Sequence, residues 1–128
     1  MIVFSAVNQA PGFTQFWPEY VRAHSQRGTR LAHLLGTLAG WILVIAAIWT
    51  RRWTWILGAL VISYALAWIS HFFIERNRPA TFEHPLWSWL ADQKMVALML
   101  AGRMSAEVAR CSSSASRSEA RDKSEASG

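Results

Sequence analysis

The chain has little of what a soluble or secreted protein normally carries. Its 128 residues include one cysteine, Cys111, so a disulfide within the chain and a cysteine-rich zinc site are excluded. Residues 1–10 lack a basic segment and a long apolar run, so we expect no signal peptide. Charged residues make up only 16%, whereas 52% are hydrophobic and eight are tryptophan, the residue favoured at membrane–water interfaces. This composition indicates one ordered domain associated with a membrane.

The net charge of +5 is unevenly distributed. Residues 111–128 contain three basic and three acidic side chains, so the whole excess lies in residues 1–110, beside the apolar runs. Anionic lipid is therefore the expected partner of these basic groups, and no nucleic-acid partner is expected.

Two apolar runs dominate the sequence, at residues 31–50 and 53–74. Each has about the 20 residues that a bilayer-spanning helix needs. Only Arg51 and Arg52 separate them, and three tryptophans flank this pair: Trp49, Trp53 and Trp55. The pattern predicts an all-α membrane protein built on a transmembrane helical hairpin.

The basic residues outside the runs predict the orientation of the hairpin. Its tip carries two arginines, whereas the opposite side carries six basic residues: Arg22, Arg27, Arg30, Arg76, Arg78 and Lys94. The positive-inside rule then places both termini in the cytoplasm. We expect a multi-pass protein of the bacterial inner membrane, or of the endoplasmic reticulum if the source is eukaryotic.

The segments around the hairpin are predicted to be shorter helices and a polar tail. Before the first run, apolar residues and a histidine recur at helical spacing and indicate an amphipathic helix: Phe16, Trp17, Tyr20, Val21 and His24. Pro79 ends the second span and Pro85 can begin another helix. Residues 86–104 contain Asp92, Gln93 and Lys94, so they are expected to lie at the interface or pack on the hairpin. The helical membrane domain thus covers 1–110, and the Ser-rich residues 111–128 are predicted to be disordered.

All four histidines fall on one side of this arrangement. His33 lies near the start of the first span and His71 near the end of the second, so antiparallel spans place them at the same depth. His24 and His84 flank the spans on that side. Ionisable groups inside membrane segments are costly and often mark function, so this clustering predicts a metal site.

The positions of His33 and His71 on their helices indicate that both side chains face the protein and not the lipid. Glu75 follows His71 by four residues, and His33 shares a face with Gly36 and Gly40, a spacing that lets helices approach closely. Imidazole ligands suit iron, zinc, copper and nickel, and a carboxylate among them favours iron or zinc. The HxxHH boxes of membrane desaturases are absent. Haem held between His33 and His71 stays an alternative.

Two segments carry a resemblance to a known family: FWPEYVRAHSQRGTRLAHLLGT and HFFIERNRPATFEHPLWSWLADQKM. Over about residues 16–103 the chain resembles small membrane proteins of the 2-hydroxy fatty acid dioxygenase type, whose characterised branch converts phytosphingosine to odd-chain fatty acids. The segment PATFEHPLWSWLAD is closer to the bacterial branch.

This resemblance implies an Fe(II)-dependent dioxygenase that cleaves a 2-hydroxy fatty acid, with O2, to the acid one carbon shorter. It assigns the metal to His24, His33 and His71, and a catalytic role to Glu75. Arg76 and Arg78 are expected to bind the substrate carboxylate. Four residues are expected to be further ligands or to orient the ligands: His84, Asp92, Tyr64 and Asn77. A non-enzymatic scaffold or haem-binding hairpin is the alternative, and chain-length preference and homo-oligomerisation stay open.

Overall fold

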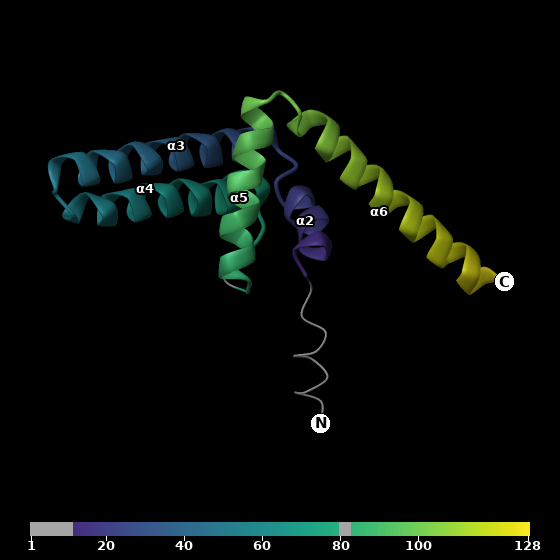
Figure 1. Cartoon of the computed structure of the whole chain (residues 1–128). Coiled ribbons are helices and arrows are strands. Elements are labelled where there is room, and N and C mark those ends of the chain that lie inside the picture. Colours follow the sequence, from purple (N-terminus) through teal and green to yellow (C-terminus); the bar gives the residue numbers. More distant parts are fainter. Residues whose placement is uncertain (1–11, 80–82) are drawn as a thin grey trace.

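The computed structural model describes residues 12–79 and 83–128, and these residues form helices joined by short turns (Figure 1). In chain order they are α2 (Phe13–Arg22), α3 (Arg27–Thr50), α4 (Thr54–Ser70), the π-helix η1 (His71–Glu75), α5 (Pro85–Leu100) and α6 (Met104–Ser127). The predicted all-α fold is therefore confirmed.

The two apolar runs form the antiparallel hairpin of α3 and α4 (Figure 1). The helix α3 ends where Arg51 adopts a left-handed conformation with φ of 57°, which turns the chain into α4. Close approach of the helices depends on Gly36 and Gly40. A Cβ at Gly36 would lie 3.3 Å from the Ser63 Cα, and Ser63 Oγ donates a hydrogen bond to the Gly36 carbonyl oxygen (2.9 Å). The predicted small-residue packing thus forms the hairpin seam.

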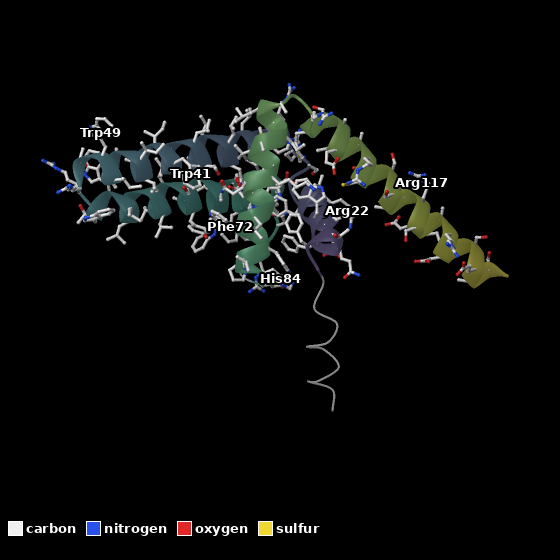
Figure 2. All side chains as sticks on the ribbon, viewed as in Figure 1. Arg22, Trp41, Trp49, Phe72, His84 and Arg117 are labelled. Carbon is white, nitrogen blue, oxygen red and sulfur yellow. The ribbon has the colours of Figure 1, made fainter. Side chains whose placement is uncertain are left out.

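Both arms of the hairpin are long and apolar enough to cross a membrane. The arms are Arg27–Thr50 and Thr54–Glu75, with mean hydropathies of 2.1 and 1.8. In the most apolar stretch of each arm only 28% and 17% of the residues are buried, so most of the apolar surface of the hairpin faces outward. Trp49 projects from the tip of the hairpin (Figure 2). By length and composition, the structure therefore contains two candidate membrane spans.

The base of the hairpin is covered by a second layer of helices. Helix α5 crosses the hairpin near its base, and α2 lies beside it (Figure 1). Pro85 begins α5 as predicted, and α5 packs on both α3 and α2. Between α2, α5 and α6 lies a cluster of buried residues: Phe16, Trp17, Tyr20, Val21, Ala91, Met95, Met104 and Cys111. The predicted amphipathic helix therefore faces a core at this end.

The prediction that residues 111–128 are disordered is wrong. They form most of α6, which extends away from the rest of the molecule (Figure 1). Its first turns are fixed because Met104 and Cys111 are buried, at 4% and 1% exposure. Beyond them the sequence contains no proline or glycine until Gly128, and Arg121 pairs with Glu125 one turn later (3.0 Å). A docked first segment removes the cost of nucleating a helix, so a polar sequence can continue it.

Candidate metal centre

Three histidines from separate parts of the chain meet at the base of the hairpin. His24, His33 and His71 are 0%, 7% and 2% exposed, and one potential ligand atom from each lies within 4.8 Å of the others. Their ring centroids are 4.4–5.2 Å apart, and the rings are nearly perpendicular. The structure thus brings together the three histidines expected to bind the metal.

Local backbone structure places each ring. His24 follows the end of α2, and Arg30 holds this turn by donating to the His24 carbonyl oxygen (2.8 Å). His33 lies on α3, and His71 opens η1. The wider turn of η1 ends at Arg76, which adopts a left-handed φ of 58°, and the Asn77 N–H then bonds back to the His71 carbonyl oxygen (2.9 Å). Single π-turns of this kind are frequent at functional sites.

Each histidine uses its Nδ1 to bond a group that can only accept. His24 Nδ1–H donates to the Tyr20 carbonyl oxygen (2.6 Å), and His33 Nδ1–H donates to the Asp92 carboxylate (2.8 Å). His71 Nδ1–H donates to Asn77 Oδ1 (2.7 Å). The amide of Asn77 is oriented for this role because its Nδ2 donates to the Ala23 carbonyl oxygen (3.0 Å). In the neutral form of each imidazole, a proton on Nδ1 leaves the lone pair on Nε2.

These Nε2 lone pairs face one another without protein donors to satisfy them. His33 Nε2 lies 3.3 Å from His71 Nε2, and the buried His24 Nε2 has no hydrogen-bond partner among the described residues. Burial, followed by the neighbouring His33 and His71, holds the pKa of His24 well below its usual value, so its imidazole stays neutral. Converging neutral imidazoles fit a bound cation, and metal-bound histidines commonly bond a carboxylate or carbonyl through the other nitrogen. The donor set suits iron, zinc, copper or nickel.

A small cavity of about 50 Å³ lies beside His33. Asp92 lines it and also accepts from Thr37 Oγ1 (2.5 Å), so both carboxylate oxygens are engaged. Tyr20 lines it too, with its ring stacked on that of His24 at 3.9 Å. The Tyr20 hydroxyl is buried without a hydrogen-bond partner among the described residues. Burial and then the charge of Asp92 raise the pKa of Tyr20, so the hydroxyl keeps its proton and remains a donor.

Glu75 lies outside the histidine group. Its carboxylate accepts from the backbone N–H of Gln26 (2.5 Å) and from Ser25 Oγ (3.2 Å), at the start of α3. A carboxylate at a helix N-terminus is favoured by the helix dipole. In this structure Glu75 thus ties the end of η1 to the turn that carries His24.

Three more candidate residues lie at the periphery. Arg76 and Arg78 are exposed and line an open depression with Phe72 and Asn77. His84 precedes α5, near the start of that helix in Figure 2; its ring packs edge-on against Phe16 at 5.5 Å, and it is not a member of the three-histidine group. Of the other candidates, Asp92 and Asn77 contact the centre directly, and Tyr64 lines the adjoining cavity.

Sequence reasoning assigned no site role to Tyr20 or Thr37. Both were signalled by helical spacing, because Tyr20 precedes His24 by four residues and Thr37 follows His33 by four. Arg30 was expected only as an interfacial positive charge, whereas it fixes the His24 turn.

Comparison with known proteins adds one finding. The family model described as "2-hydroxy-palmitic acid dioxygenase Mpo1-like" matches residues 11–104, which is most of the chain and includes all three buried histidines. No curated protein and no solved structure matched the chain.

Proposed function

Because the chain belongs to the Mpo1-like family of 2-hydroxy-palmitic acid dioxygenases, we propose that it is an iron(II)-dependent enzyme that shortens 2-hydroxy fatty acids by one carbon. The observation that supports this proposal most strongly is the group of three buried imidazoles, in which one potential ligand atom from each lies within 4.8 Å of the others and the His24 Nε2 has no hydrogen-bond partner among the described residues. Three protein ligands leave open coordination positions, as non-haem oxygenases require.

The proposed overall reaction balances with O2 alone. It converts R–CH(OH)–COOH and O2 to R–COOH, CO2 and H2O, so the C1–C2 bond breaks and the four electrons released reduce O2 to the oxidation level of water. No further reductant is needed. His24, His33 and His71 would hold iron(II), which would supply the redox chemistry with O2 and open coordination positions for the substrate.

The side chains of the centre have distinct roles in this proposal. His24, His33 and His71 hold the metal, while Asp92 and Asn77 fix the ring orientation and tautomer of His33 and His71. The Tyr20 hydroxyl donates a hydrogen bond to an oxygen of the substrate head group in the adjoining cavity. Burial of all three histidines limits access of bulk water to the reacting groups.

We place this chemistry at the cytoplasmic interface of a membrane. The support comes from the outward-facing apolar surface of the two candidate spans and from the position of the histidines at their base. A fatty acid can then keep its chain in the apolar phase while its head group reaches the centre.

Arg76 and Arg78 stay candidates for drawing the carboxylate toward the site from the aqueous side. For Glu75 we propose an indirect role through the His24 turn.

The haem alternative fits the geometry poorly. The Nε2 atoms of His33 and His71 are only 3.3 Å apart, and the His24 ring lies against both. A macrocycle cannot enter between rings packed in this way, whereas a single ion can. Visible absorption of the purified protein checks this, because a strong Soret band would favour haem.

The decisive test of the proposed function is turnover by the anaerobically iron-loaded full chain. We expect 2-hydroxypalmitate under air to give pentadecanoate and CO2, while palmitate, which lacks the chelating hydroxyl, stays unchanged. Protein loaded with zinc(II) is the matched control and should be inactive, because zinc(II) has no redox chemistry. Iron-loaded protein that leaves 2-hydroxypalmitate intact would overturn the proposal.

A further inference from the structure

A groove of about 270 Å³ runs between α3 and α4 and meets the cavity beside His33. The two spaces share five lining residues and so adjoin each other: Thr37, Ser63, Tyr64, Trp89 and Asp92. The groove volume is close to the lower end of small-molecule sites, about 300 Å³. Its inner end therefore opens at the candidate metal centre.

The groove changes from polar to apolar along its length. Near the centre it is lined by hydroxyl and carboxylate groups, as at Thr37 and Asp92. Further along, its floor is formed by Gly40 and Ala59, where α3 and α4 approach closely. Its outer end, toward the hairpin tip, is formed by Val44, Ile56 and Leu60. The polarity thus follows that of a fatty acid with its head group at the centre.

The length of the groove also fits an acyl chain. From His33 to Val44 the helix α3 advances by about 16 Å, at a rise of about 1.5 Å per residue. An extended chain with C–C bonds of about 1.5 Å covers this distance with roughly a dozen carbons. The groove is bordered on the α5 side by a hydrogen bond from Trp41 Nε1 to Gln93 Oε1 (2.9 Å), which ties α3 to α5.

We propose that this acyl groove binds the hydrocarbon chain of the substrate, with the methyl end between Val44 and Ile56, and that these two residues limit chain length. The assignment of the head group rests on the proposed function, whereas binding of the chain does not. Chain length is then selected in a groove that follows the α3–α4 seam beside α5, although lipid surrounds the hairpin on its other faces.

The first experiment tests occupancy without turnover. A 2-hydroxy fatty acid with a diazirine at its methyl end is photolysed with the metal-free full chain in phospholipid nanodiscs, and adducts are mapped by mass spectrometry. We expect adducts at Val44, Ile56 and Leu60 that excess palmitate or 2-hydroxypalmitate abolishes. Adducts concentrated on outward-facing residues such as Ile42 and Ile45, and insensitive to added fatty acid, would show that the chain stays in bulk lipid and would overturn the proposal.

The second experiment tests the length limit. In iron-loaded protein, Val44→Phe should move the preferred substrate about four carbons shorter, because filling the outer end removes about one helical turn, 5.4 Å, of groove. The matched control is Ile45→Phe, which adds the same ring at a neighbouring outward-facing position and should leave the preference unchanged. An unchanged preference in Val44→Phe would overturn the proposal.

The two experiments separate failure of the inference from failure of the proposed function. Adducts in the groove without turnover of any chain length would support the acyl groove and contradict the dioxygenase proposal. Turnover with adducts outside the groove would support the enzyme and contradict the acyl groove.

Discussion

The orientation of each imidazole at the centre depends on one acceptor, which is local for His24 and His71 and comes from α5 for His33. The acceptors are the Tyr20 carbonyl, the Asp92 carboxylate and the Asn77 amide oxygen. Each fixes a proton on Nδ1 and so frees Nε2 for a ligand. The affinity of the centre for metal therefore depends on residues that do not touch the metal.

Asp92→Asn should weaken metal binding while the three histidines remain. An amide in this place can present N–H to His33 Nδ1, which favours the tautomer whose Nε2 carries the proton. We expect iron affinity to fall by about 10–100-fold, as for other partners of metal-bound histidines. Competition with a chelator measures this loss. Glu119→Gln makes the same carboxylate-to-amide change on the exposed part of α6 and should retain affinity; equal affinity in Asp92→Asn and wild type would contradict this role.

Tyr20→Phe should separate metal binding from turnover. The ring that stacks on His24 is kept, so iron content should match wild type. Loss of one hydrogen bond to the substrate should lower kcat/KM by about fivefold, since such a bond contributes about 1 kcal/mol. Steady-state kinetics with 2-hydroxypalmitate measures this change. Normal kinetics in Tyr20→Phe would show that its hydroxyl does not contact the substrate.

At this scale the sequence named the candidate ligands and two groups that could orient them, Asp92 and Asn77, but not which histidine each group bonds. The matched depth of His33 and His71 followed from two antiparallel runs, and the resemblance added His24. The bond from His71 to Asn77 depends on the π-turn and on Arg76 in a left-handed conformation, which apolar periodicity does not reveal. The His33–Asp92 bond depends on where α5 crosses the hairpin, a tertiary feature that leaves no local signal.

At the scale of elements, α6 shows how composition can mislead. A Ser-rich sequence that cannot form a core was predicted to be disordered, but a helix anchored at one end does not need a core along its whole length. The buried side chains of Met104 and Cys111 supply that anchor. The helices with strong periodicity or clear terminators, α2 and α5, began close to where the sequence indicated.

Truncation of α6 should distinguish its anchored part from its exposed part. A chain ending at Ser116 keeps Cys111 buried and should unfold at the wild-type temperature. A chain ending at Arg110 loses that contact and should be less stable by about 1–2 kcal/mol. Thermal unfolding in detergent measures both. Equal stability of the two truncated chains would contradict an anchoring role for Cys111.

The contact between α2 and α6 should weaken in acid. Glu107 accepts from Trp17 Nε1 (2.7 Å) and pairs with Arg110, and these bonds lower the pKa of Glu107 from 4.5 to about 2. A carboxyl with a lowered pKa stabilises the fold above its unfolded pKa, and this stability is lost as pH falls from about 4.5 to 2.

Glu107→Gln isolates this effect. The difference in unfolding temperature between wild type and variant should be constant above pH 5 and shrink toward zero at pH 2. Because the Arg110 side chain that pairs with Glu107 is largely exposed, we expect a small difference even at neutral pH. A difference in unfolding temperature that does not change with pH would mean that the ionised Glu107 carboxylate does not stabilise the fold.

At the scale of the whole molecule, the hairpin and the helices at its base have separate roles. The hairpin provides two apolar arms, a narrow seam and the acyl groove, while α2 and α5 close the base around the histidines. The sequence predicted the hairpin because apolar length is a local property. The crossing of α5 over the base was not predictable, because it depends on long-range packing among α2, α3 and α5.

The most direct test of the central claim is the iron content of membrane-inserted histidine variants. Wild type should bind about one iron(II) per chain, as should His84→Ala, whose ring lies outside the group. His24→Ala, His33→Ala and His71→Ala should each insert normally and lose the iron, because the hairpin keeps its apolar length but the centre loses one of three ligands. Full iron content in all three variants would contradict a metal centre formed by these histidines.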